Sequence, residues 1–149
     1  MNYTFTIKGN PTPLARARIR PNYVFSSTKK KMWDPQKELK LITAISLRNQ
    51  FEAQGIMTDL TKLKNEVIFH TPIHLDVIFY MPVPKTSKIR MERAKEKYHF
   101  KRPDLDNLIK FVCDACMGVL YKDDSIIVSI NAKKVYSSNA RTVFTISEI

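Results

Sequence analysis

The stretch IHLDVIFYMPVP, residues 73–84, constrains the fold more than any other segment of the chain. Apolar residues alternate along it and would share one face of a β-strand: Ile73, Leu75, Val77 and Phe79. Pro82 and Pro84 lack backbone donors and therefore mark where this strand ends. A strand with one apolar face needs a second layer to cover it, so we expect helices packed on one side of a sheet.

Residues 34–52 are expected to form a first helix. Asp34 is its predicted N-cap, Pro35 is its first helical residue, and the pattern runs to about Glu52. The apolar spacing predicts its buried face: Leu39, Ile42 and Ile45 or Ser46.

A second helix is expected after residue 103. Asp104 or Asp106 would cap it, and Gly118 would stop it. Its apolar stripe at helical spacing is Leu105, Leu108, Val112, Ala115 and Val119. Cys113 and Cys116 form one C-x-x-C inside this helix, and without a second pair we interpret them as small buried hydrophobes.

Three further segments favour strands. Residues 3–7 alternate and end at a Gly-Asn-Pro turn, while residues 125–136 and 141–149 are β-rich runs that Ser-Ser-Asn would join as a hairpin. The order strand, helix, strand, helix, strand, strand predicts an α+β fold of two layers: a small mixed β-sheet with helices packed on one face. Residues 1–149 fit a single domain.

The composition favours a soluble protein. Hydrophobic residues make up 44% of the chain, and none of its apolar runs approaches the ~18 residues that a membrane span needs. Met1 to Lys8 alternates polar and apolar residues, unlike a signal peptide, so we expect a cytoplasmic protein.

Positive charge is concentrated in two segments of a chain whose net charge is +11. Residues 16–31 and 85–102 hold fourteen of the twenty-five Lys and Arg residues. The first segment belongs to a proline-interrupted extended arm, which we call the basic arm (residues 10–33). Such clusters suit a phosphate backbone, although a solvated surface that only aids solubility is an alternative. The candidate DNA contacts here are Arg16, Arg18, Arg20, Lys30, Lys88 and Arg90.

Carboxylates are concentrated where the second helix starts. Asp104 and Asp106 stand there, and period-two alternation places Asp124 on the face of the next strand that a helix must cover. That face also holds Ile126, Val128 and Ile130. If the three carboxylates converge, a cation must bridge them, and all-oxygen ligands favour Mg²⁺ or Mn²⁺ over zinc. The alternative is that the aspartates only cap the helix.

Lys110 lies four residues beyond Asp106, on the same side of the helix. It could stabilise charge on a reacting phosphate or orient the attacking water, or it could only form an ion pair with Asp106 or Asp114. Metal-bound carboxylates in basic surroundings suit hydrolysis of a phosphodiester. A nucleic-acid binder with a capped acidic helix remains the alternative on residue types alone.

The stretch RPDLDNLIKFVCDACMGVLYKDDSIIVSINAKKVY resembles the signature of the RusA-type Holliday junction resolvases, which requires aspartates, Asn and Lys at fixed spacing. IKGNPTPLARARIR and FYMPVPKTSK are also similar to the family's opening and central segments, so the resemblance covers nearly the whole chain. It implies that Asp104, Asp106 and Asp124 are metal-binding catalytic carboxylates and that Lys110 is the catalytic lysine. Lys134 matches the lysine that closes the next strand, and we count it among the DNA contacts.

The resemblance also implies a homodimer that binds four-way DNA junctions and makes paired, Mg²⁺-dependent nicks. Two identical sites related by a two-fold axis suit a junction with the same symmetry. Two alternatives stay open: a nuclease for flaps, forks or other branched DNA, and a non-catalytic basic DNA-binding protein.

Overall fold

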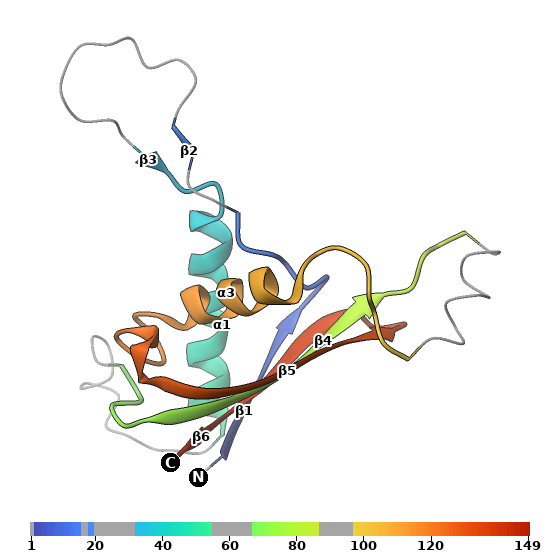
Figure 1. The fold of residues 1–149 in the computed structure, drawn as a ribbon. Helices are drawn as coiled ribbons and strands as arrows, with labels where there is room; N and C mark the ends of the chain where they lie inside the picture. Colours follow the sequence, from blue (N-terminus) through green and yellow to red (C-terminus); the bar gives the residue numbers. More distant parts are fainter. Residues whose placement is uncertain (1, 16–17, 20–31, 55–66, 87–96) are drawn as a thin grey trace, which may run out of the picture.

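The computed structural model describes five parts of the chain: residues 2–15, 18–19, 32–54, 67–86 and 97–149 (Figure 1). For residues 18–19 and 32–33 it describes the backbone only.

The main sheet has four strands. They are β1 (Asn2–Lys8), β4 (Ile73–Pro82), β5 (Ile127–Ser137) and β6 (Arg141–Glu148), in the spatial order β1-β6-β4-β5. Strand β6 is antiparallel to both β1 and β4, whereas β5 is parallel to β4. In the basic arm, β2 (Arg18–Ile19) pairs with β3 (Met32–Trp33) as a separate two-stranded ladder.

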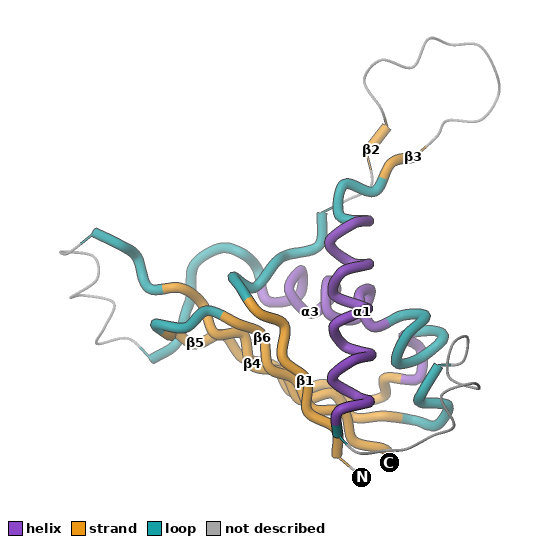
Figure 2. The backbone as a smooth tube through the Cα atoms, turned by 180° about the vertical axis from the view of Figure 1, so that it is seen from behind, coloured by secondary structure: helices purple, strands orange, loops and turns teal. Residues whose placement is uncertain are grey.

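Two helices cover one face of the main sheet. Helix α1 (Lys37–Ala53) packs against β1 and against helix α3 (Leu105–Cys116), which also contacts β5 (Figures 1 and 2). The predicted α+β fold, with a mixed sheet and helices on one face, is confirmed. The order of the main elements is also the predicted one.

The core lies between β4 and the two helices. As the alternation in residues 73–79 predicted, one face of β4 is buried: Ile73, Leu75, Val77 and Phe79, followed by Met81. The helices contribute Leu47 and Phe51 from α1 and Leu108 and Val112 from α3. On the neighbouring strands Phe5 and Phe144 stack with their ring centroids 5.2 Å apart.

The buried face of α1 differs from the predicted one. Its buried residues are Thr43, Leu47 and Phe51, whereas the residues predicted to be buried are exposed: Leu39, Ile42, Ile45 and Ser46. Phe51 packs against the rings of Tyr3 and Phe69, and this large aromatic surface determines how the helix is rotated. Figure 1 shows the first turns of α1 extending past α3 and away from the sheet, where apolar residues have no layer to cover.

The start of α1 also differs. The helix begins at Lys37, and Gln36 rather than Asp34 is its N-cap residue. Asp34 instead accepts a hydrogen bond from the backbone N–H of Gln36 at 2.8 Å. Its carboxylate therefore stabilises the turn before the helix, and the helix starts two residues later than predicted.

The predicted hairpin between residues 125–136 and 141–149 is wrong. Strands β5 and β6 both form, but β4 lies between them in the sheet. The buried face of β4 has five apolar positions, so this strand gains most from a central place with a neighbour on each side. Residues 138–140 therefore cross the end of β4 instead of forming a tight turn.

The predicted strand around Asp124 is also corrected. Asp124–Ile126 forms a turn of 3₁₀ helix, η1, and β5 starts only at Ile127. The register between β4 and β5 shifts after Ile73, which breaks the period-two alternation on which the prediction depended. Val128 and Ile130, expected beneath a helix, are exposed.

Helix α3 agrees closely with its prediction. Asp104 is the N-cap residue, the helix ends at Cys116, and Gly118 has a φ of 75° in the turn that follows. Leu108, Val112 and Ala115 of the predicted stripe are buried. Cys113 and Cys116 are buried free thiols, as interpreted, and burial followed by the charge of Asp124 raises the pKa of Cys113 to about 11. Across the described ranges, none of the helices is long and apolar enough to cross a membrane.

Candidate active site

Two exposed carboxylates stand at the start of α3. Asp104 has the extended backbone of an N-cap residue, yet its side chain makes no capping hydrogen bond. Asp106 lies in the first turn of the helix. The alternative in which Asp104 serves as a side-chain cap therefore does not account for its carboxylate.

Lys110 contacts Asp106 across one turn of α3. Its Nζ lies 3.3 Å from Oδ2 of Asp106, and both side chains are mostly exposed. This hydrogen bond is the main reason why the pKa of Asp106 lies below its ordinary value. The carboxylate is thus held ionised with a positive charge beside it.

The neighbours Asp123 and Asp124 have different surroundings. Asp123 accepts a hydrogen bond from the backbone N–H of Ser125 at 2.9 Å, which caps η1 and lowers the pKa of Asp123. The exposed carboxylate of Asp124 accepts no hydrogen bond from the described part of the chain. Its charge instead raises the pKa of the nearby Cys113 and Tyr121, in addition to the effect of their burial.

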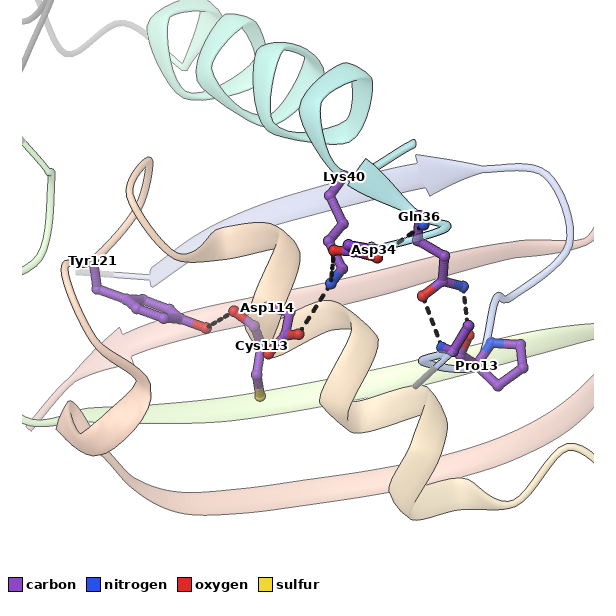
Figure 3. Close-up of polar contacts among 8 residues, drawn as sticks. Pro13, Asp34, Gln36, Lys40, Cys113, Asp114 and Tyr121 are labelled. Atoms are coloured by element: carbon purple, nitrogen blue, oxygen red, sulfur yellow. Dashed lines mark hydrogen bonds and ion pairs between the residues drawn. The ribbon is translucent and has the colours of Figure 1, made fainter. Parts of the chain in front are cut away.

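Tyr121 and Leu120 hold the segment between α3 and Asp124 in place. This buried tyrosine donates a hydrogen bond from its hydroxyl to the carbonyl oxygen of Cys113 at 3.0 Å (Figure 3). The preceding residue, Leu120, accepts hydrogen bonds from the backbone N–H groups of Ile68 and Phe69. The chain after α3 is therefore fastened beside the last turns of the helix.

The expected convergence of three carboxylates is not found. Asp104 and Asp106 stand at the start of α3, beside the end of β5 that holds Lys134, while Asp124 lies in η1 at the opposite end of β5. All three are described residues, and within the described ranges no group of three His, Cys, Asp or Glu side chains could hold one metal ion. Helix α3 and strand β5 run in opposite directions, so the start of β5 lies away from the start of α3 (Figure 1).

Lys134 lies at the other end of β5, beside the start of α3. Its Nζ donates hydrogen bonds to the carbonyl oxygens of Lys101 at 2.8 Å and Pro103 at 2.7 Å. The side chain is half-buried. Its ammonium therefore holds the segment that leads into Asp104, a role that we had not predicted.

The basic arm also contacts this site. The backbone N–H of Leu14 donates to the carbonyl oxygen of Asn107 in the first turn of α3, at 2.9 Å. The Gln36 side chain accepts a hydrogen bond from the Ala15 N–H and donates one to the Pro13 carbonyl oxygen, both at 2.8 Å (Figure 3). Among the candidate DNA contacts, Arg16, Arg20, Lys30, Lys88 and Arg90 lie outside the described residues, and Arg18 is described by its backbone alone.

Comparison with known proteins identifies the chain's relatives. The family model of the endodeoxyribonuclease RusA matches residues 8–147, nearly the full chain. The chain belongs to the RusA endodeoxyribonuclease family. It is also 31% identical over 150 residues to the "Uncharacterized protein YqaN" of Bacillus subtilis (strain 168), a match that covers 97% of this chain and 95% of that protein.

RusA-family membership agrees with the resemblance seen in the sequence. It supports a metal-dependent nuclease that acts on DNA junctions. Asp104 and Asp106 fit such a metal ion, because both carboxylates are exposed and carboxylate oxygens are the ligands that Mg²⁺ prefers. Mg²⁺ keeps several waters and is often held by one or two carboxylates together with substrate phosphates, so it does not need a cage of three.

Sequence reasoning missed the contact that fastens α1 to the last turn of α3 in this RusA-family chain. Lys40 of α1 bridges Asp34 at 3.0 Å and Asp114 of α3 at 3.2 Å (Figure 3). Partial burial opposes the charge of Lys40, but the hydrogen bonds to both carboxylates outweigh it and raise its pKa. No local pattern signals this bridge, because Lys40 and Asp114 are 74 positions apart.

Proposed function

We propose that this chain is a Mg²⁺-dependent, structure-selective endodeoxyribonuclease that resolves Holliday junctions by paired symmetric nicks. Mn²⁺ would substitute for Mg²⁺. Membership of the RusA family supports the class of reaction. The choice of four-way junctions over other branched DNA, the metal and the homodimeric state are our inferences.

One observation at the start of α3 supports this proposal most directly. The carboxylate of Asp104 is exposed and does not cap the helix that it precedes, and Asp106 follows two residues later. A basic protein gains little from two exposed carboxylates at one point unless they bind a cation. Leu14 of the basic arm donates a backbone hydrogen bond to Asn107 in the same turn, and the first arginine of the arm, Arg16, follows two residues later in the sequence.

Each side chain has a proposed role. Asp104 and Asp106 would hold the ion, which when bound supplies Lewis acidity to activate water and to stabilise the leaving 3′-oxygen. Lys110 lies beside Asp106 and offers positive charge to the reacting phosphate. Lys134 acts as a positioning residue through the carbonyl groups of Lys101 and Pro103.

Asp124 is proposed as the third catalytic carboxylate. Its carboxylate accepts no hydrogen bond from the described residues, whereas the carboxylate of Asp123 caps η1. Its place beside Cys113 means that it would reach an ion at Asp104 only if bound DNA or metal draws η1 towards the start of α3. Catalytic hydrogen bonds that are long in ligand-free structures tighten on binding, and this step requires a larger movement than that.

DNA contacts are proposed along the two basic segments: Arg16, Arg18, Arg20, Lys30, Lys88 and Arg90. A four-way junction has two-fold symmetry, and a homodimer would present two identical sites related by the same axis. Two nicks of like polarity follow from that arrangement.

Incubation of end-labelled synthetic DNA with the protein tests the proposal. The substrates are a mobile four-way junction, a replication fork, a flap and a linear duplex, each with Mg²⁺ and with chelator. We expect paired nicks in the junction only when Mg²⁺ is present. Faster cutting of forks or flaps would favour the branched-DNA alternative. Salt-sensitive binding without any metal-dependent product would reject nuclease activity in favour of a DNA-binding protein.

A further inference from the structure

The segment that leads into α3 runs along the free edge of β5. The backbone N–H of His99 donates to the carbonyl oxygen of Lys134 at 3.0 Å, and that of Tyr136 donates to the carbonyl oxygen of Lys97 at 3.2 Å. Tyr98, between these two contacts, forms a bridge to the same strand. Because β5 is an edge strand of the sheet, this pairing holds residues 97–99 in an extended conformation.

Side chains alternate along this segment. The ring of His99 is half-buried and packs against Tyr136 with the centroids 5.0 Å apart. Its two neighbours point the other way, so that Tyr98 is 57% exposed and Phe100 is 65% exposed. We call residues 97–101 the aromatic strip. Single exposed apolar residues are ordinary, but two large rings at alternate positions of a fastened backbone form a surface.

Each exposed ring carries a lysine. The Nζ of Lys97 lies 5.5 Å from the ring centroid of Tyr98, and the Nζ of Lys101 lies 5.2 Å from that of Phe100. Both distances are those of cation–π contacts. Each ring therefore has a cation over one face, and this combination of positive charge and exposed ring suits a polyanion with flat apolar groups better than an apolar protein partner.

The aromatic strip adjoins the candidate active site. Phe100 precedes Asp104 by four residues, which span at most about 14 Å of extended chain. The carbonyl groups of Lys101 and Pro103, between them, are both held by Lys134. The rings are thus kept at a limited distance from the carboxylates.

We propose that Tyr98 and Phe100 form a stacking platform for nucleobases at the branch point of DNA. The nucleic-acid ligand is taken from the function proposed above. Within a continuous duplex each base is covered on both faces by its neighbours, whereas a base beside a branch has a face free for an aromatic ring. The platform would therefore bind branched DNA in preference to linear duplex.

The test measures binding without metal, so it does not depend on catalysis. A four-way junction carries a fluorescent adenine analogue beside the branch point, or in the middle of one arm, in the presence of a chelator. We expect the wild-type protein to quench the analogue at the branch only. Phe100→Ala and Tyr98→Ala should each weaken junction binding about tenfold and reduce the quenching, with linear-duplex affinity unchanged.

Two further variants separate ring stacking from general apolar contact. Phe100→Tyr keeps an aromatic ring and should retain the quenching, whereas Phe100→Leu keeps the apolar character and should not. Ile149→Ala removes an even more exposed apolar side chain at the end of the chain and should leave the quenching and the junction affinity unchanged. Thermal melting of each variant verifies folding, which these exposed substitutions should leave intact.

The platform would be overturned if the alanine variants lost as much affinity for linear duplex as for the junction. It would also be overturned if Phe100→Leu quenched the analogue as fully as the wild type. The result is separable from that of the nuclease test. Quenching at the branch without cutting in Mg²⁺ would keep the platform and reject the nuclease. Cutting of the junction with quenching unchanged in the alanine variants would reject the platform and keep the nuclease.

Discussion

The ammonium of Lys134 donates a hydrogen bond to the carbonyl oxygen of Pro103 at 2.7 Å, one residue before Asp104. The same nitrogen donates to the carbonyl oxygen of Lys101. A lysine that the sequence places at the end of a strand thus fastens that strand to the start of α3. The position of Asp104 depends on this contact between two distant segments.

Replacing Lys134 by alanine should therefore impair cleavage more than DNA binding. We expect turnover on junctions to fall roughly 10- to 100-fold, because a shift of about 1 Å in a catalytic group has effects of that size. The Mg²⁺ concentration for half-maximal rate should rise, and Lys134→Arg, which keeps two donors, should recover part of the rate. Lys133→Ala, an exposed neighbour, is the control. A loss of DNA affinity with turnover unchanged would instead make Lys134 a DNA contact.

Asp104→Asn should abolish Mg²⁺-dependent cleavage while junction binding in chelator stays within about twofold. The substitution removes a ligand charge but adds no bulk, and it does not reduce the positive charge that attracts DNA. Cleavage gels and binding titrations on the same junction measure both effects. Cutting at the wild-type rate would remove Asp104 from the site.

Asp124→Asn and Asp123→Asn form a matched pair. Asparagine at position 123 keeps the oxygen that accepts the Ser125 hydrogen bond, so η1 should remain capped and activity should persist. Asp124→Asn should abolish cleavage if that carboxylate reaches the metal in the complex with DNA. Activity in Asp124→Asn together with a loss in Asp123→Asn would exchange the assignments of the two residues.

Lys110→Ala should lower turnover on junctions more than affinity, since the exposed ammonium offers charge to the reacting phosphate. Lys110 lowers the pKa of Asp106. Loss of Lys110 lets the pKa of Asp106 return upward towards 3.8, so the carboxylate stays ionised near pH 8. A rate loss at pH 8 therefore cannot come from protonation of Asp106. An unchanged turnover number at that pH would refute the catalytic role, and Lys122→Ala is an exposed control.

Lys40→Ala should lower the free energy of unfolding by about 1–2 kcal/mol, because it removes partly buried ion pairs with Asp34 and Asp114. The pKa of Asp34 is lowered on folding, first by the hydrogen bond from the Gln36 N–H and then by that from Lys40; the stability due to this lowering is present above pH 3.8 and lost as the pH falls through the folded value. The pKa of Lys40 is raised on folding, so the stability that its charge contributes is fully present below pH 10.5 and is lost as the pH rises through the folded pKa.

The destabilisation by Lys40→Ala should accordingly be nearly constant between about pH 5 and 9 and shrink at both extremes. Urea unfolding at several pH values measures it, with Lys37→Ala, an exposed lysine of the same helix, as the control. Equal stabilities of the two variants at pH 7 would contradict the bridge.

Local patterns were informative where one residue spacing dominates. The alternation of Ile73, Leu75, Val77 and Phe79 correctly predicted the buried face of β4, and Asp104 correctly predicted the start of α3. On α1, by contrast, Leu39, Ile42 and Ile45 form an apolar stripe as regular as a buried one. Their exposure results from the place where the helix crosses the sheet, which its own spacing does not encode.

By itself, the sequence determined the class of fold, the family and the residues that carry charge and carboxylates, because these depend on residue type and short-range period. The tertiary structure alone decided that β4 separates β5 from β6, that Asp124 lies beside Cys113, and that Lys134 holds the residues before Asp104. The physical reason is that periodicity determines which residues of one element share a face. Which elements then meet, and at which ends, depends on packing between segments far apart in the chain.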